Sequence, residues 1–190
     1  MNQSSFWRAL EARLAQTADP RHRTNLATVI AHSKAEVGGD IDGVLATLTA
    51  EPSYAIWADG RDIGPKGRDG VVAFYTALMS TGSFDIEAPI ERLVVDDDTI
   101  VTEMAVRQAM PGPIARANGY QVDDDSAFYL IEFRTVVLWR FLSDGKLAGE
   151  DAYSSRNLAD IRKLEDTEVP ENLRRLIETN TGNPDYVFFG

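Results

Sequence analysis

The sequence predicts an α+β fold, and two patterns in its apolar residues carry that prediction. Over much of the first 80 residues, apolar side chains recur every three to four positions, which is the spacing of amphipathic helices. From residue 84 to residue 155 they mostly alternate with polar residues, which is the spacing of half-buried strands. At 190 residues the chain has the length of one ordinary domain, so both kinds of element are expected to share a core.

Three helices are predicted within the first 50 residues. Ser4 or Ser5 is expected to cap the first helix, which ends before Asp19-Pro20. The proline starts a central helix that ends near Gly38-Gly39, where glycine permits the positive φ angle of a helix end. Asp40 supplies the N-cap carboxylate of the third helix.

His32 and Glu36 lie four residues apart on the central helix, so their side chains stack one above the other. They stand at the border of the apolar stripe, where a side chain can reach into a cavity that the helix covers. On a helix, a histidine and a glutamate at this spacing are more often a solvated surface pair. Spacing alone leaves both interpretations open. The stripe itself consists of Leu26, Val29, Ile30, Ser33 and Val37.

A first strand carrying Tyr54, Ile56 and Trp57 follows, and then a loop with four glycines leads to a helix over residues 68–80. The glycines match neither the Rossmann nor the Walker phosphate-binding pattern, so we interpret them as a connection. Asp59 lies two positions after Trp57 and is expected on the same face if the strand continues.

Two ribbons of sheet are predicted at residues 84–95 and 99–110, joined by an acidic turn at residues 96–98. Three adjacent aspartates suggest a metal site, but in a hairpin turn they are more often solvated turn formers, and no metal is predicted. Alternation assigns an inward face to the second ribbon. That face consists of Ile100, Thr102, Met104, Val106 and Gln108.

Residues 111–127 are predicted to be an irregular polar insertion, either disordered or a functional lid. A long strand over residues 128–142 and a last strand over residues 147–155 follow it, and Pro170 starts a helix in the tail. The apolar end of the chain, residues 185–190, is expected to dock on the body or on a second subunit. The apolar face of the long strand consists of Tyr129, Ile131, Phe133, Val137, Trp139 and Phe141.

Composition excludes several classes of function. A net charge of −11 and a pI near 4.6 argue against nucleic acid and anionic membrane as partners. The chain has no cysteine, which excludes disulfides and thiolate chemistry. The first residues lack the features of a signal peptide and no run reaches the length of a membrane span, so a cytoplasmic protein is expected.

Three motifs follow one another along the chain: HSKAEVGGDID from His32, GRDGVVAFY from Gly67 and FLSDGKLAGEDAY from Phe141. Their order and spacing resemble the SnoaL-like polyketide cyclase branch of the nuclear-transport-factor-two-like superfamily. The resemblance implies a cone, in which a curved, mostly antiparallel sheet wraps around helices and leaves an apolar pocket, as in a cystatin-like α+β barrel. Residues 20–156 would form the cone, residues 1–19 an N-terminal helical extension and residues 157–190 a C-terminal helical tail.

The resemblance also implies roles for single residues. Compared with ketosteroid isomerase, His32 stands in place of the oxyanion-hole tyrosine, with Tyr75 behind it and Phe74 in the pocket wall. Trp57 and Val137 stand where that family has its two acids, which argues against ketosteroid isomerisation by the usual residues.

Glu150 is implied to face the pocket from the last strand. An acid in that position would have the raised pKa of a general acid or base. A buried glutamate paired with an arginine for structural reasons is the other interpretation.

Together these features predict a cofactor-independent proton-transfer enzyme, a cyclase, isomerase or dehydratase, that acts on a small hydrophobic oxygenated molecule. His32 would be the base, with Tyr75 or Glu36 holding its tautomer, Glu150 would be its acid partner, and Asp59 a reserve acid. The substrate would contact Trp57, Phe74, Tyr75, Met104, Val106, Phe133 and Trp139.

Two other functions stay open. One is a non-catalytic ligand-binding or protein-interaction domain, and the other is a subunit resembling the small subunit of ring-hydroxylating dioxygenases. The resemblance further implies a homodimer that forms through the sheet.

Overall fold

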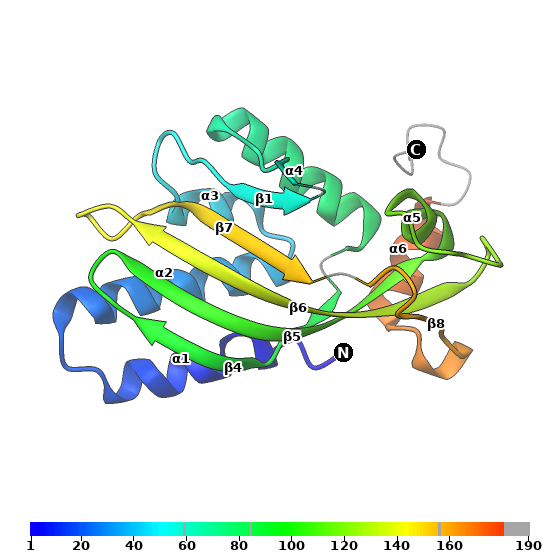
Figure 1. The fold of residues 1–190 in the computed structure, drawn as a ribbon, viewed down its shortest axis with the longest axis horizontal. Coiled ribbons are helices and arrows are strands. Elements are labelled where there is room, and N and C mark those ends of the chain that lie inside the picture. The colour runs from blue at the N-terminus through cyan, green and yellow to red at the C-terminus, as the bar shows by residue number, and fades with distance from the viewer. Residues whose placement is uncertain (59, 84, 156, 181–190) are drawn as a thin grey trace.

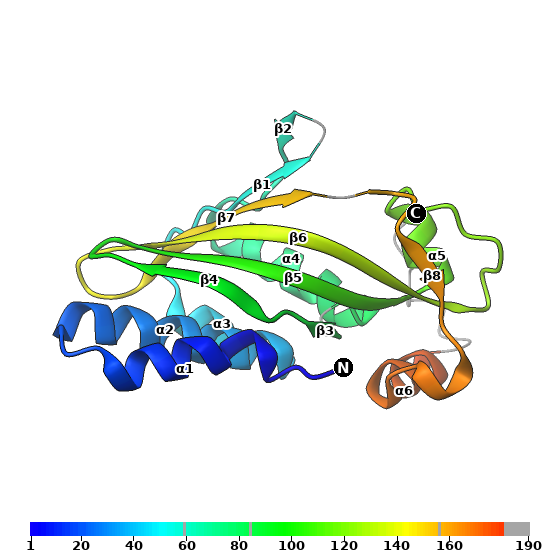
Figure 2. The same ribbon diagram turned by 60° about the horizontal axis from the view of Figure 1, so that its bottom comes forward.

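A computed structural model describes residues 1–58, 60–83, 85–155 and 157–180. Helices α1 (Ser5–Gln16), α2 (Pro20–Val37), α3 (Ile41–Thr47) and α4 (Gly67–Thr81) pack against one face of a curved sheet (Figures 1 and 2). In the part of the chain that the structure describes, no helix lies over the middle of the opposite face (Figure 2). The predicted α+β class, with helices inside a curved sheet, is confirmed.

The sheet has eight strands in the order β2-β1-β7-β6-β5-β3, with β4 paired to β5 and β8 paired to β6. Only the β1–β7 pair is parallel, so the sheet is mostly antiparallel, as predicted. The strands are β1 (Ala55–Ala58), β2 (Arg61–Asp62), β3 (Ile86–Glu87), β4 (Ile90–Val95), β5 (Thr99–Pro111), β6 (Phe128–Phe141), β7 (Leu147–Ser155) and β8 (Ile161–Lys163).

The main core lies between the helices and the inner face of the sheet. Over residues 99–106 of β5 and 135–141 of β6, buried residues alternate with less buried ones, as expected for a sheet with one dry face. The inward set predicted on β5 is confirmed for Ile100, Thr102, Met104 and Val106, which are buried. Their cross-strand partners Trp139, Val137, Thr135 and Phe133 on β6 complete this surface.

Most helix ends follow the predicted signals. Pro20 is in the first turn of α2, Asp40 accepts a hydrogen bond from the Gly43 amide, and Gly39 has a φ of 71°. Ser4 is at the N-cap position of α1, as predicted, but its side chain makes no capping hydrogen bond. The Ser5 hydroxyl instead accepts a hydrogen bond from the Ala88 amide and ties α1 to the sheet.

Two segments differ from the sequence prediction. The ribbon predicted over residues 84–95 is divided within its described residues, 85–95, because Pro89, which has no N–H to donate, separates β3 from β4. Residues 111–127 are not wholly irregular, since they contain the short helix α5 (Gly112–Ala117). Apolar residues in and around α5 bury one another in a small second core: Met110, Ile114, Ala115, Tyr120, Val122, Tyr129 and Ile131.

The tail adds β8, a 3₁₀ turn (Asp166–Glu168) and α6 (Glu171–Asn180), which follows Pro170 as predicted. Figure 2 shows α6 below the end of the sheet that carries β8. The predicted docking of residues 185–190 lies outside the described residues. Among the described residues, no helix is both long enough and apolar enough to cross a membrane.

Candidate active site

His32 is fully buried between α2, α3, α4 and the sheet, and both of its ring nitrogens have partners. Nδ1 lies 2.7 Å from the Thr47 hydroxyl, and Nε2 lies 2.9 Å from the Tyr75 hydroxyl. Nε2 also lies 3.0 Å from Oε1 of Glu150. The histidine and glutamate that the sequence suggested, separated by more than a hundred residues, are therefore in direct contact.

Thr47 fixes the tautomer of His32. The Thr47 hydroxyl donates its one hydrogen to the Val44 carbonyl oxygen at 2.6 Å, so it can only accept from Nδ1–H of His32. The proton that His32 gains or loses must then be the one on Nε2, which faces Glu150. Tyr75 or Glu36 had been predicted to hold the tautomer, and nothing in the local sequence around Thr47 indicated this role.

Two tyrosines extend the network. The Tyr75 hydroxyl donates to Oε1 of Glu150 at 3.1 Å, so His32 Nε2, Tyr75 Oη and Glu150 Oε1 form a triangle with sides of 2.9–3.1 Å. The Tyr54 hydroxyl lies 3.3 Å from that of Tyr75. Sequence reasoning gave Tyr54 no role at the site, because its position on the first strand carried no signal of one.

The charges of the site favour an imidazolium–carboxylate pair. Burial alone would lower the pKa of His32, but the charge and hydrogen bond of Glu150, helped by Glu36, raise it above the ordinary value of 6.5. Burial and the charge of Glu150 raise the pKa of Tyr75 and Tyr54 well above 10, so both phenols remain donors.

Glu36 is a second acid beside this pair, one helical turn after His32. Burial and the charge of Glu150 raise the pKa of Glu36 to about 7, with His32 acting in the opposite direction. Glu36 is only partly buried, so water screens part of the electrostatic interaction that raises its pKa.

Glu150 is the member of the triangle that solvent reaches. Its side chain is 15% exposed, whereas that of His32 is 0% exposed. Exposure increases along the same face of β7, from half-buried Ala152 to exposed Ser154. A small molecule would therefore meet the triangle at Glu150, approaching from the Ser154 end of the strand.

Five of the predicted wall residues lie in the main core, and two of them, Trp139 and Phe74, contact this network. Met104, Val106 and Trp139 are buried and Phe74 and Phe133 are partly buried, all in the main core. The Trp139 ring lies 5.8 Å from the His32 ring, and Phe74 makes edge contacts with Tyr54 and Tyr75. Val106 and Phe133 also line a hollow of about 370 Å³ that extends to Arg107 and Arg134.

Trp57 lies elsewhere, and Asp59 lies outside the described residues. Trp57 pairs with Tyr153 on β7, so alternation puts it on the opposite face of the sheet from Glu150. It is 46% exposed and stacks on Tyr153 with the two rings 14° from parallel. The structure does not bring Trp57 to the triangle.

The part of the chain that carries both His32 and Glu150 matches a known protein family. The model of the SnoaL-like domain matches residues 29–150, which is more than half of the chain. The chain belongs to the SnoaL-like domain family. It has no significant sequence match among curated proteins.

Solved structures share the fold of this SnoaL-like domain at low sequence identity. A candidate SnoaL-like polyketide cyclase from Jannaschia sp. CCS1 is 19% identical with a TM-score of 0.56, over 74% of this chain and 91% of that one. The epoxide hydrolase/cyclase-like enzyme SalBIII, which has a role in pyran ring formation in the polyether salinomycin, is 13% identical with a TM-score of 0.53, over 74% and 95%. A computationally designed 17-OHP binder is 17% identical with a TM-score of 0.51, over 75% and 98%.

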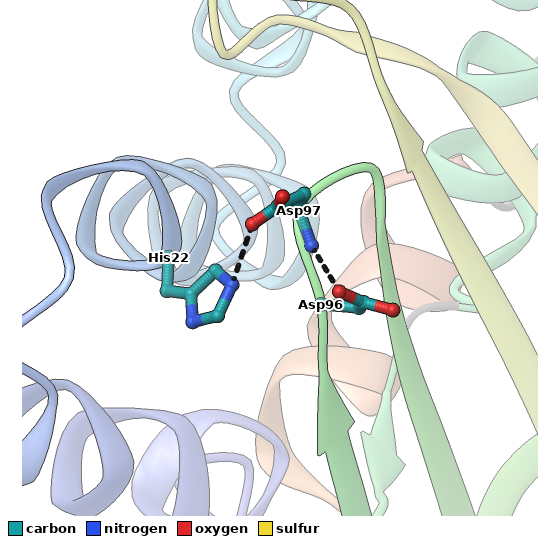
Figure 3. Close-up of side chains that lie close together, drawn as sticks. All are labelled: His22, Asp96 and Asp97. Atoms are coloured by element: carbon teal, nitrogen blue, oxygen red, sulfur yellow. Dashed lines mark hydrogen bonds and ion pairs between the residues drawn. The ribbon is translucent and has the colours of Figure 1, made fainter.

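One group of side chains could offer ligands to a metal ion. His22, just before the matched SnoaL-like region, lies near Asp96 and Asp97 of the β4–β5 turn, with ligand atoms within 4.8 Å of one another (Figure 3). Figure 3 shows His22 directed at Asp97, while Asp96 accepts a hydrogen bond from the Asp97 amide. Arg21 binds both the Asp97 carbonyl oxygen and the Asp98 carboxylate. These contacts attach the turn to the start of α2, which agrees with the predicted role of the aspartates as turn formers.

Proposed function

We propose that this SnoaL-like domain is a proton-transfer enzyme, a cyclase, isomerase or dehydratase, that acts on a small hydrophobic oxygenated molecule without a cofactor. The observation that carries the proposal is the triangle of His32, Tyr75 and Glu150, in which the side chain of His32 is 0% exposed and that of Glu150 is 15% exposed. A cytoplasmic location remains a prediction from composition.

Glu150 is the group that would exchange a proton with the substrate. His32 has no exposed surface and both nitrogens are bonded, so we assign it to electrostatic support, which reverses the roles expected from the sequence. His32 Nε2 and the Tyr75 hydroxyl both contact Oε1 of Glu150, and these two contacts fix the orientation of the carboxyl group.

The chemistry is enolisation. The Glu150 carboxylate takes a proton from a substrate carbon next to a carbonyl, so that a C–H bond breaks, an O–H bond forms and the electron pair moves onto the carbonyl oxygen. The enolate then attacks a second carbonyl carbon, moves its double bond or expels a hydroxyl group. Glu150 returns the proton to the new alkoxide, to another carbon or to the departing hydroxyl, and is ready for another turnover.

The SnoaL-like relatives support this range of reactions. The names of the Jannaschia protein and of SalBIII both include cyclase chemistry. Ring closure by an enolate or an alkoxide needs one proton acceptor next to an apolar surface, which is what the Glu150 site offers.

The proposal is tested by hydrogen exchange with solvent. Aromatic polyketide-like and terpenoid ketones would be incubated in deuterium oxide, and deuterium at the carbon next to the carbonyl measured by mass spectrometry. We expect exchange with the unaltered chain and a loss of about 10²–10⁴-fold in Glu150→Gln, the usual contribution of a general base. Glu51→Gln, at an exposed glutamate, is the matched control and should keep full activity.

A second candidate is a non-catalytic binding domain. Two observations favour it. Both ring nitrogens of His32 already have hydrogen-bond partners within the chain, and the designed 17-OHP binder uses a similar fold for binding. If ketones raise the melting temperature but no deuterium is incorporated, or if Glu150→Gln exchanges at the normal rate, the enzyme proposal is wrong.

A further inference from the structure

A buried carboxylate outside the triangle follows the C-terminal end of α4. Asp85, just before β3, is 2% exposed, and its side-chain oxygen Oδ2 has no hydrogen-bond partner. Its backbone is well anchored, because its amide donates to Gly82 at 3.1 Å and its carbonyl oxygen accepts from the Ala109 amide at 3.3 Å. A buried carboxylate oxygen without a donor is costly and calls for an explanation.

Asp85 lines a small cavity where α6 packs against the end of α4. The cavity has a volume of about 90 Å³ and is lined by Gly82, Asp85, Asn172, Leu173 and Leu176. The packing around it is close, since a methyl group at Gly82 would come within 2.4 Å of the Leu173 side chain. The cavity therefore lies in the packing interface between α4 and α6 and is not a shallow depression of the surface.

One cation and one neutral amide lie near Asp85 and compensate only part of its charge. Burial raises the pKa of Asp85, against the positive charge of the Met1 amino group and a hydrogen bond from the Asn172 side chain. Neither the amino group nor the Asn172 side chain donates a hydrogen bond to Oδ2, which has no partner.

We propose that this cavity binds the ammonium group of a small alkylamine. The ammonium would donate to Oδ2 of Asp85, and its short alkyl group would lie against Leu173 and Leu176. Anions are excluded by the carboxylate. Mg²⁺ and Ca²⁺ need about six to eight oxygen ligands, far more than one carboxylate and one amide provide. Since a water molecule occupies about 30 Å³, the cavity admits only a molecule of a few heavy atoms.

Ethylammonium chloride is the probe, followed by backbone amide shifts in nuclear magnetic resonance, with sodium chloride at equal ionic strength and ethanol as references. We expect saturable shifts centred on Gly82, Asp85 and Leu173 that neither reference produces. Asp85→Asn should weaken binding by about tenfold or more, because a charge-assisted hydrogen bond is lost. Asp42→Asn, at an exposed aspartate on α3, should bind as the unaltered chain does.

A second variant keeps the test decisive if Asp85→Asn does not fold. Leu176→Phe retains the carboxylate but fills the cavity, and should weaken binding to a similar extent. Equal shifts with sodium chloride or ethanol, shifts that map elsewhere, or unchanged affinity in either variant would mean that the cavity holds only water. Neither variant touches the triangle, so both should keep the deuterium exchange of the unaltered chain, and the two proposals fail separately.

Discussion

At the scale of single residues, the chemistry of the site depends on which nitrogen of His32 carries the fixed proton. Thr47 decides this through a chain of two hydrogen bonds that starts at the Val44 carbonyl oxygen. The consequence reaches Glu150, because Nε2 is left as the nitrogen that shares a proton with it. Thr47 is thus a positioning residue that never needs to touch a substrate.

Replacing Thr47 by Val keeps the shape of the side chain but removes the acceptor of Nδ1–H. We expect a loss of about 1–3 kcal/mol in the free energy of unfolding, the usual cost of a buried unpaired donor. At a pH above the folded pKa of His32, where the ring is neutral, its nitrogen chemical shifts should also show a mixture of tautomers. Thr49→Val, at a partly buried threonine nearby, is the control. A single Nδ1–H tautomer in Thr47→Val would show that Thr47 does not fix it.

Glu36 should make the stability of the protein depend on pH. Its pKa rises from 4.5 in the unfolded chain to about 7 in the folded one, so the folded state holds its proton more tightly. The free energy of unfolding should therefore fall as the pH rises from about 4.5 to about 7. The raised pKa of His32 adds stability below 6.5 that is lost as the pH rises through its folded value.

Glu36→Gln should flatten the first of these two slopes and weaken the second, because the charge of Glu36 helps to raise the pKa of His32. Urea unfolding over this pH range measures both. We expect the variant to be more stable than the unaltered chain above the folded pKa of Glu36, because a poorly solvated charge has been removed. Identical pH profiles would mean that Glu36 is as well solvated in the folded state as in the unfolded one.

At the scale of elements, the joint between α4 and α6 depends on one glycine. Gly82 has a φ of 70°, and a Cβ at this position would clash with Leu173. Gly82→Ala should cost backbone strain of about 1–3 kcal/mol plus the cost of moving α6. Gly39→Ala is a matched control, since φ is 71° there and nothing lies within 4 Å of the added methyl group. Equal losses of stability in the two variants would show that α6 packs loosely on α4.

The helices and strands also differ in how well the sequence predicted them. Regular periodicity predicted α2, α4 and the long strands because each follows one repeat over many residues. It did not predict α5, whose six residues are too few to establish a period. At the site, the family motifs brought out His32, Tyr75 and Glu150. Thr47 and Tyr54 were missed because only the packing of α3 and β1 against α2 and α4 makes them neighbours of these residues.

At the scale of the whole molecule, the helices leave one face of the sheet uncovered (Figure 2). The charged residues on this face are largely paired within the chain, as in the contacts of Arg134 with Glu91 and Glu103. The stacked pair of Trp57 and Tyr153 adds exposed aromatic surface to it. A second copy of the chain would meet few unpaired charges there, and aromatic side chains are enriched in such interfaces.

We propose that two copies pair through this face in the isologous manner of most homodimers. Light scattering after size-exclusion chromatography should give twice the mass of the chain, and Trp57→Ser combined with Tyr153→Ser should give a monomer that keeps its melting temperature. Leu142→Ser, at an exposed leucine beside the β6–β7 turn, should leave the dimer intact. A monomeric unaltered chain at all concentrations, or a dimer that survives the double change, would place the aromatic pair outside any dimer interface. Because Trp57 and Glu150 lie on opposite faces of the sheet, loss of the dimer should leave deuterium exchange at Glu150 unchanged.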